Sequence, residues 1–261
     1  MTAVDFAAFV DRLATVSGEA ILPFFRTSLG VENKGGPGTF DPVTAADRAA
    51  ETAMRTLIRQ SFPDHGIIGE EFGSEREDAE FVWVLDPIDG TKSFISGVPL
   101  FGTLIALARR GRPILGIIDQ PISRERWVGA AGRPSTFNGE PVRCRPCVSL
   151  AAATIFATSP DMFAGDDAAG FRRVASAAKL VRFGADCYAY ALVAHGFIDL
   201  VIEASLKAYD FSAMLPIVEG AGGVATDWQG APLGLTSDGR VLVAGDRRVH
   251  REALALVGRH C

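Results

Sequence analysis

The sequence lacks the features that mark membrane, secreted and nucleic-acid-binding proteins. No apolar run reaches the roughly 18 residues that a membrane-spanning helix needs. The N-terminal region carries Asp5 and Asp11 instead of a basic segment followed by an apolar one, so we expect no signal peptide. Asp and Glu (31) outnumber Lys and Arg (26), and the net charge of −5 provides no overall attraction to nucleic acid or acidic membranes. We therefore predict a cytoplasmic protein that binds neither nucleic acid nor a membrane.

Cysteine is also scarce, with four residues in a chain of 261. Cys144 and Cys147 form a C-x-x-C motif, while Cys187 and Cys261 stand alone. A zinc site of this kind needs a second such pair, and one short motif is weak support for a redox role. We expect reduced thiols, and the sequence assigns no role to Cys144 and Cys147.

The length and the hydrophobic pattern predict a single domain, residues 1–261, built from two unlike subdomains. A chain of this size with 48% hydrophobic residues can bury a substantial core. In the first subdomain, about residues 1–150, apolar residues at helical spacing predict helices at 6–25 and 44–61. Alternating and apolar runs then predict strands at residues 81–85, 103–108, 113–119 and 126–130. This half is predicted to be α+β, with helices on a largely antiparallel sheet.

The second subdomain, about residues 151–261, alternates between strands and helices and is predicted to be α/β. Strands are expected from about 153, between the first two helices, and at 198–203 and 241–244. Helices are expected near 171–178 and 186–195, from 210, and at 247–257. No internal repeat or low-complexity tract interrupts this order.

The most informative segment is Val82-Trp-Val-Leu-Asp86-Pro-Ile-Asp89-Gly90-Thr91. Four apolar residues predict a buried strand, and two carboxylates follow at its end, where open α/β sheets often bind ligands. Neighbouring carboxylates repel each other unless a cation neutralises them, and clusters of oxygen ligands suit Mg²⁺ or Mn²⁺. Gly90 permits close approach of a ligand to the backbone. The segment is typical of a metal-and-phosphate site, although Asp-Pro and Asp-Gly are also ordinary turn residues.

Two further acidic residues are candidates for the same site. Glu70 follows the short apolar run Ile67-Ile68-Gly69, and it would join Asp86 and Asp89 if both strands ended at the same edge of the sheet. Asp210 precedes an apolar helical pattern and is well placed as a helix N-cap, which alone would explain an aspartate there. Capping and metal binding are compatible, because a carboxylate has two oxygens.

The combination of these segments resembles the inositol monophosphatase family of magnesium-dependent, lithium-sensitive phosphomonoesterases. The resemblance covers nearly the whole chain. It rests on Gly69-Glu70-Glu71, Asp86-Pro-Ile-Asp-Gly-Thr91, Tyr209-Asp210 with Glu219-Gly-Ala-Gly-Gly223, and the upstream pattern Asp41-Pro-Val-Thr-Ala-Ala-Asp47. It implies a five-layer αβαβα sandwich, an active site between the two halves, a small-molecule phosphate monoester as substrate, and a homodimer.

Finer strings resemble the histidinol-phosphatase branch of this family. These strings are Gly90-Thr-Lys-Ser-Phe-Ile95, Phe101-Gly-Thr-Leu-Ile105, Ile118-Asp-Gln-Pro121, Asp186-Cys-Tyr-Ala-Tyr190 and Asp199-Leu-Val-Ile-Glu-Ala204. The resemblance implies hydrolysis of L-histidinol phosphate in histidine biosynthesis. Inositol-1-phosphate or broad sugar-phosphate hydrolysis is the alternative, and a regulatory or RNA-associated protein on the same fold is a second one.

The family resemblance also implies a set of ligands for two to three Mg²⁺ ions, with Mn²⁺ as a possible substitute. Glu70, Asp86 and the carbonyl of Ile88 would hold one ion. A second ion would be held by Asp86, Asp89 and Asp210. A third ion, rich in water ligands, would face Glu70.

The catalytic residues implied in the same way are Asp47, Thr91 and Glu70. Asp47 and Thr91 would form a hydrogen-bonded pair that orients the attacking water. Asp89 and the N–H groups of Gly90 and Thr91 would contact the substrate phosphate. From the sequence alone, Asp47 could equally be a solvent-facing helix residue or a capping partner of Thr44.

Substrate choice requires residues beyond this common set. Histidinol phosphate carries a cationic amine, which favours carboxylates in the pocket, whereas inositol phosphate offers only hydroxyls. Asp186 and Glu203 are the candidates, and inositol-specific relatives tend to have a small residue at the position of Asp186. The alternatives are a helix N-cap for Asp186 and a surface charge at the end of a strand for Glu203.

Overall fold

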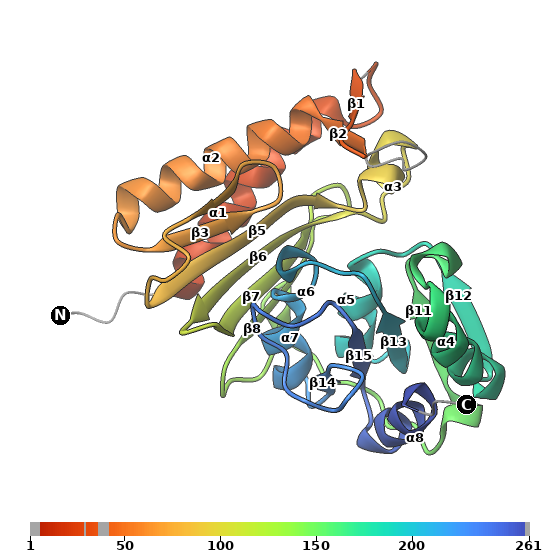
Figure 1. Cartoon of the computed structure of the whole chain (residues 1–261). Helices are drawn as coiled ribbons and strands as arrows, with labels where there is room; N and C mark the ends of the chain where they lie inside the picture. Colours follow the sequence, from red (N-terminus) through yellow and green to blue (C-terminus); the bar gives the residue numbers. More distant parts are fainter. Residues whose placement is uncertain (1–5, 29, 36–41, 259–261) are drawn as a thin grey trace.

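The chain folds into five layers, in the order helices, sheet, helices, sheet, helices (Figure 1). This computed structural model describes residues 6–28, 30–35 and 42–258. Asp41 of the upstream pattern and Cys261 lie outside the described residues. Within those residues, no helix combines the length and apolar content that a membrane crossing requires. The layered αβαβα architecture expected from the resemblance is confirmed.

The larger sheet contains eight strands in the order β10-β9-β8-β7-β6-β5-β3-β4. All neighbouring pairs are antiparallel except β3 and β5, which run parallel. The prediction of a largely antiparallel first half is therefore confirmed. The strands are β3 (Gly66–Gly69), β4 (Gly73–Glu75), β5 (Phe81–Asp89), β6 (Gly102–Arg109), β7 (Arg112–Gln120), β8 (Glu125–Ala130), β9 (Thr136–Phe137) and β10 (Glu140–Pro141).

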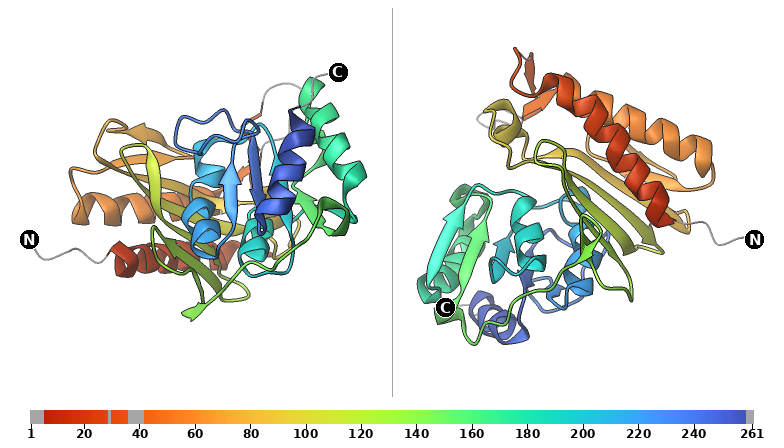
Figure 2. Two further views of the ribbon diagram at one scale, coloured as in Figure 1. Left: turned by 90° about the horizontal axis from the view of Figure 1, so that it is seen from below. Right: turned by 180° about the vertical axis from the view of Figure 1, so that it is seen from behind.

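Two antiparallel helices, α1 (Phe6–Ile21) and α2 (Ala45–Ser61), cover one face of this sheet (Figure 2). Their apolar stripes pack with the inward side chains of β5, β6 and β7, including Trp83 and Ile105. A short hairpin, β1 (Val31–Asn33) with β2 (Pro42–Thr44), connects the two helices. Thr44 and Asp47 form a capping box at the start of α2, so the capping alternative for Asp47 is confirmed and the solvent-facing one is wrong.

The smaller sheet has five strands in the order β12-β11-β13-β15-β14. It is mixed, since β12, β11 and β13 are parallel while β15 is antiparallel to its neighbours. The predicted alternation of strands and helices is found, and the strand 241–244 and the helix 247–257 match to the residue. The strands are β11 (Thr154–Ala157), β12 (Leu180–Phe183), β13 (Leu200–Glu203), β14 (Val224–Thr226) and β15 (Val241–Ala244).

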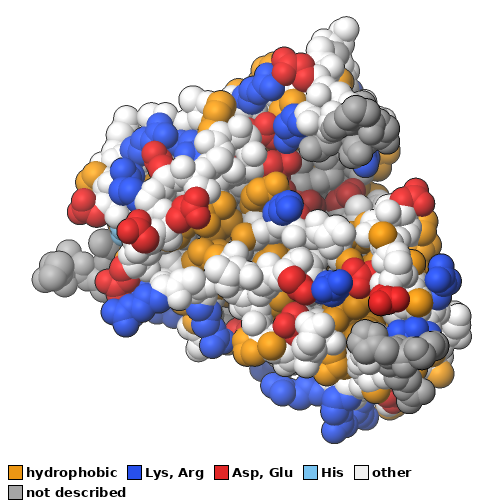
Figure 3. All heavy atoms as spheres, viewed as in Figure 1, with side chains coloured by type: hydrophobic (Ala, Val, Ile, Leu, Met, Phe, Trp, Pro, Cys, Tyr) orange, Lys and Arg blue, Asp and Glu red, His pale blue; other side chains and the backbone are white. Residues whose placement is uncertain are grey.

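The middle layer joins the two sheets and positions the site. It contains α5 (Tyr188–Ala194), α6 (Ala208–Phe211) and α7 (Met214–Gly220), which pack between the sheets (Figures 1 and 2). The outer face of the smaller sheet is covered by α4 (Gly165–Ala177) and α8 (Arg247–Val257). Figure 3 shows acidic side chains in a recess between the two halves.

Candidate metal and substrate site

An irregularity at the end of β5 brings two aspartates together. In a regular strand, residues three apart point to opposite faces of the sheet. The pairing of β5 with β6 shifts register between Asp86 and Asp89. The carbonyl of Pro87, inside this bulge, accepts a hydrogen bond from the Thr103 hydroxyl (2.8 Å), which in turn contacts Ser17 (2.9 Å). The bulge is therefore held by buried polar contacts, and it directs both carboxylates into one site.

Asp210 completes the acidic cluster from the other half of the chain. Carboxylate oxygens of Asp86, Asp89 and Asp210 all lie within 4.8 Å of one another. Asp210 is not the N-cap that the sequence predicted. It is the third residue of α6, where its Oδ2 accepts the N–H of Lys207 (2.7 Å). The hydrogen bond from Lys207 uses one oxygen of Asp210 and leaves the other without a hydrogen-bond partner among the described residues.

The electrostatics of this cluster fit a bound cation. Burial raises the pKa of Asp86 well above its usual range, and the charges of Glu70, Asp89 and Asp210 raise it further. Burial raises the pKa of Asp210 to about 7, against the hydrogen bond from Lys207. Asp86 Oδ1 is buried and has no hydrogen-bond partner. Clustered carboxylate oxygens of this kind are the ligands that Mg²⁺ prefers.

Glu70 lies at the same rim, as the sequence suggested. Because β3 and β5 are parallel, with Gly69 opposite Leu85, their carboxyl ends coincide, and the Glu70 N–H donates to the Leu85 carbonyl (3.2 Å). The Glu70 carboxylate also accepts a hydrogen bond from Lys34 Nζ (3.0 Å), and Lys34 contacts Glu71 as well (2.7 Å). A lysine on the β1–β2 hairpin therefore supplies positive charge at the edge of the acidic cluster.

The hydrogen bond predicted between Asp47 and Thr91 is not formed. Asp47 Oδ2 accepts both the N–H (2.8 Å) and the hydroxyl (2.6 Å) of Thr44. The Thr91 hydroxyl donates instead to the carbonyl of Ile88 (3.0 Å), the carbonyl expected to bind metal. Asp47 Oδ1 is buried without a hydrogen-bond partner. The capping box therefore takes one oxygen of Asp47 and leaves the other unused.

Thr91 begins the short helix α3 (Thr91–Ile95), and Gly90 precedes it with φ +86°. A side chain is strained in this left-handed region, so glycine is the residue that the turn requires. No side chain caps the start of α3. The contact expected between the N–H groups of Gly90 and Thr91 and a phosphate group stays a prediction.

Asp186 and Glu203 lie in the same small cavity as Asp89 and Asp210. This cavity has a volume of about 150 Å³, and it is also lined by Thr158, Met162, Cys187, Tyr190 and Leu206. The N-cap alternative for Asp186 is wrong, because α5 begins at Tyr188 with no side-chain cap. Asp186 has φ +45°, and its Oδ2 accepts a hydrogen bond from the Ser93 hydroxyl (2.9 Å).

Glu203 is buried, so the surface-charge alternative is wrong for this residue as well. Its Oε1 accepts the N–H (2.8 Å) and hydroxyl (2.6 Å) of Thr158, and its Oε2 accepts the Tyr190 hydroxyl. Burial raises the pKa of Glu203, while the hydrogen bonds from Thr158 and Tyr190 lower it. Three donors hold this carboxylate at the wall of the cavity.

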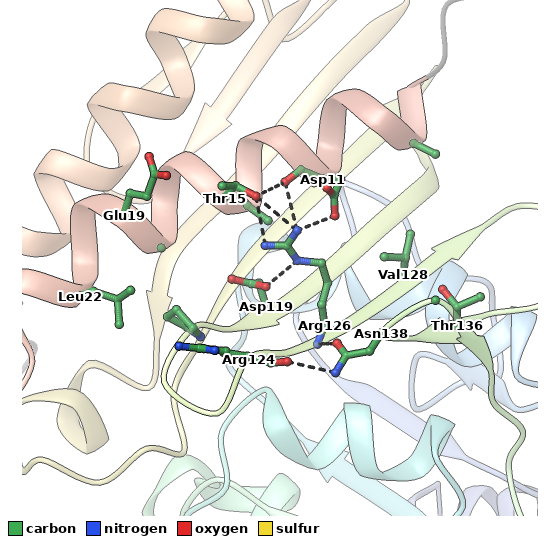
Figure 4. A pocket seen from close by; sticks show the side chains of 15 residues that line it. Asp11, Thr15, Glu19, Leu22, Asp119, Arg124, Arg126, Val128, Thr136 and Asn138 are labelled. Carbon is green, nitrogen blue, oxygen red and sulfur yellow. Dashed lines mark hydrogen bonds and ion pairs between the residues drawn. The ribbon is translucent and has the colours of Figure 1, made fainter.

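A larger cavity, of about 670 Å³, lies between α1 and the strands β7 to β9, away from the acidic cluster (Figure 4). Its principal charged group is Arg126, which donates to Asp119 (2.6 Å), Asp11 and Thr15. The Asn138 amide bridges the backbones of Arg124 and Arg126. Since the buried polar groups here hydrogen bond to one another, we interpret the region as a structural contact between a helix and a sheet.

Several contributors to the site were not found from the sequence. Ser93 holds Asp186, Thr158 and Tyr190 hold Glu203, and Lys34 pairs with Glu70. Tyr190 lies among apolar residues at helical spacing, where core packing is the default interpretation. Ser93 lies in the string Gly90–Ile95 that carries the branch resemblance, but nothing in that string assigns it a role, and Thr158 has no neighbouring motif in the sequence.

Comparison with known proteins agrees with this geometry. Residues 4–260 match the Inositol monophosphatase family. The chain is 48% identical to the bifunctional phosphatase IMPL2, chloroplastic, of Arabidopsis thaliana, over 95% of this chain and 74% of that protein. It is 36% identical to a histidinol-phosphatase of Chlorobaculum parvum, over 95% and 94% of the two chains.

The fold comparison leads to the same family. A solved inositol monophosphatase from Zymomonas mobilis superposes with a TM-score of 0.90 at 46% identity, covering 99% of this chain and 100% of that one. The likeness spans both halves and therefore includes all the acidic residues described above. The chain belongs to the inositol monophosphatase family.

Proposed function

We propose that this protein hydrolyses L-histidinol phosphate to L-histidinol and phosphate, with Mg²⁺ as cofactor. The family supports a phosphomonoesterase, and its members are in general Mg²⁺-dependent. One observation carries the choice of substrate. The cavity that holds Asp89 and Asp210 also holds two further carboxylates, Asp186 and Glu203, where an amine of the substrate would need them.

The acidic cluster would bind the metal. Asp86, Asp89 and Asp210, with Glu70 and the carbonyl of Ile88, would hold two to three ions. Bound Mg²⁺ neutralises phosphate charge and lowers the pKa of a water. The unpartnered Oδ1 of Asp86 supports this assignment, because a buried carboxylate oxygen without a partner is costly.

The residues around the cluster would hold and orient the reactants. The N–H groups of Gly90 and Thr91 would bind phosphate oxygens at the start of α3. The Thr91 hydroxyl and Asp47 would orient the attacking water. The Thr91 hydroxyl can take this role in two ways: it can leave the Ile88 carbonyl, or it can keep donating to that carbonyl while it accepts a hydrogen bond from the water. Asp47 Oδ1 is available as a hydrogen-bond partner.

Asp186 and Glu203 would recognise the cationic amine. Asp186 uses one oxygen for Ser93 and leaves Oδ1 available, whereas Glu203 already accepts three hydrogen bonds. A carboxylate can accept about four hydrogen bonds, so both groups retain capacity for an ammonium donor. We therefore assign the larger share of amine recognition to Asp186.

The decisive experiment compares kcat/KM for histidinol phosphate and inositol-1-phosphate in the same preparation. A preference for histidinol phosphate supports the proposal, and a preference for inositol-1-phosphate favours the alternative. No phosphate release from either compound or from sugar phosphates, with Mg²⁺ present and chelator as the control, would favour a non-enzymatic protein. The expected cytoplasmic location and homodimer remain predictions.

A matched pair of variants tests the recognition step. A hydrogen bond to a charged group is worth roughly 1.5–3 kcal/mol, so Asp186→Asn should lower kcat/KM for histidinol phosphate by roughly ten- to a hundredfold. Glu203→Gln should follow the same trend. Hydrolysis of p-nitrophenyl phosphate, which has no amine, should change little. Asp161→Asn, at an exposed aspartate of the same half, is the control.

A further inference from the structure

Two loops from opposite halves of the chain are joined above the acidic cluster. One is the segment Asp89–Ser93, which turns from β5 into α3, and the other is Gly184–Cys187, which precedes α5. Asp89 Oδ2 accepts the N–H of Cys187 (2.5 Å), and the Ser93 hydroxyl donates to Asp186 Oδ2 (2.9 Å). The phosphate side and the recognition side of the cavity are thus connected by direct hydrogen bonds.

The contact between these loops is close. A Cβ atom on Gly90 would lie 3.0 Å from Asp186 Oδ2 and 3.1 Å from its Cβ, tighter than ordinary van der Waals contact. Gly90 therefore permits the Asp186 side chain to pack directly on the phosphate turn. Asp186 itself has φ +45°, a conformation that few residues with side chains adopt. Its carboxylate reaches this position only because its surroundings hold it there.

Ser93 is the side chain that fixes the Asp186 carboxylate. The Ser93 hydroxyl is the group that hydrogen bonds to this carboxylate in the described structure, and it engages Oδ2 alone. A carboxylate bound through one oxygen has a defined rotation, and its second oxygen is presented in a fixed direction. Lys92, the preceding residue, is exposed and adds a favourable charge nearby.

We propose that Ser93 is a positioning residue for substrate specificity: it orients Asp186 so that the free Oδ1 meets the amine of the substrate. This inference rests on the proposed function and assigns a role to a residue that does not contact the reacting phosphate through its side chain. The effect of Ser93 should therefore depend on whether the substrate carries an amine.

The experiment compares Ser93→Ala with the wild type on two substrates. One is histidinol phosphate, and the other is 3-(imidazol-4-yl)propyl phosphate, which lacks both the amine and its charge. Loss of one hydrogen bond to a charged group should raise KM for histidinol phosphate by about tenfold with little change in kcat. KM for the amine-free compound should stay within about twofold of the wild type on the same scale.

Two variants control for folding and for chemistry. Ser93→Thr keeps the hydroxyl and should restore most of the affinity for histidinol phosphate. Ser96→Ala, at an exposed serine that follows the same helix and whose hydroxyl has no hydrogen bond in the described structure, should leave both substrates unchanged. A thermal melt of each variant confirms that the fold is retained.

A double variant separates this inference from the proposed function. If Ser93 acts through Asp186, then Ser93→Ala should cost nothing further in an Asp186→Asn background. Equal losses on both substrates, or no loss on either, would show that Ser93 is structural and overturn the inference. If Asp186→Asn is selective for the amine but Ser93→Ala is not, the inference fails and the proposed function stands. If Asp186→Asn itself is not selective, both fail.

Discussion

Two groups of carboxylates in this protein lie on opposite sides of the larger sheet and have opposite surroundings. Asp86, Asp89 and Asp210 face one another, with one oxygen of each within 4.8 Å of the others, and among the described residues no cationic side chain is hydrogen bonded to them. Asp11 and Asp119 face Arg126, which bonds to both and also to Thr15 (Figure 4). The first group concentrates charge of one sign, and the second neutralises it.

The difference indicates how the two groups are used. Burying like charges lowers stability unless a ligand compensates, so the folded protein retains the first group only at a cost. The second group links α1 to β7 and β8 and needs no ligand. A cavity of about 670 Å³ beside paired opposite charges is therefore a less convincing site than one of about 150 Å³ that is lined by carboxylates of one sign.

The sharpest test of this comparison replaces one acidic ligand. Asp89→Asn and Asp210→Asn should each lower kcat on the order of 10³-fold, because each removes a charge that would hold the cation while keeping the side-chain shape. The metal-free variants should unfold at the same temperature as the wild type or a higher one, since one repelling charge is gone. Near wild-type turnover at saturating Mg²⁺ would contradict the assignment.

The next largest effect is expected at Thr91. Thr91→Ala should lower kcat on the order of 10²-fold and change KM much less, because orientation of the water matters in the transition state. Thr91→Ser, which keeps the hydroxyl, should retain most of the activity. If Thr91→Ala raises KM alone, Thr91 binds phosphate and does not orient water.

The sequence identified the members of the acidic cluster better than it identified their local geometry. Strand–Asp-x-x-Asp and Gly-Glu-Glu are local patterns, so Asp86, Asp89 and Glu70 could be found before the fold was known. The register shift at Pro87, which aligns Asp86 with Asp89, depends on pairing with β6, and its one local signal is a proline that cannot donate to the ladder. The capping position of Asp210 and the partner of Thr91 were also wrong, although both contacts are local, since Lys207 and Ile88 each lie three residues upstream.

Removal of the Arg126 side chain should have the opposite effect to a substitution in the acidic cluster, because it should lower stability and leave turnover unchanged. Arg126→Met leaves Asp119 buried and unpaired, and it should lower the free energy of unfolding by about 2–3 kcal/mol. This is below the value for a fully buried pair because Arg126 is partly exposed. Turnover of the folded enzyme should not change. Arg110→Met removes an exposed pair with Glu80 and is the control, expected to cost about 0–1 kcal/mol. Equal losses in both variants would contradict the comparison.

The acidic cluster should also make the stability of the metal-free protein depend on pH. Because the pKa of Asp210 is raised to about 7 on folding, the metal-free folded state binds a proton more tightly than the unfolded state does. Stability from this group is present at low pH and is lost as pH rises through 7. The melting temperature of the metal-free protein should thus fall between about pH 4 and pH 7 and level off above that. Excess Mg²⁺ should remove this decline, and Asp210→Asn should weaken it. A melting temperature that rises over this range without metal would contradict the assignment.

The smallest effect is expected at the cysteines. Cys144 is half-buried and Cys147 is buried, and both are free thiols. Burial raises the pKa of Cys144 to about 11 and also raises that of Cys147, so thiolates suited to zinc or redox chemistry are disfavoured. Cys147 instead donates to the carbonyl of Ser149 (3.4 Å).

In the described residues, the acidic cluster is the group of three His, Cys, Asp or Glu side chains that fits a metal. The double variant Cys144→Ser, Cys147→Ser should therefore retain turnover and metal content. Loss of stoichiometric zinc on substitution, measured by elemental analysis, would instead establish a second metal site. The contrast between the acidic cluster and the neutralised group around Arg126 would then no longer describe all the metal-binding groups of the protein.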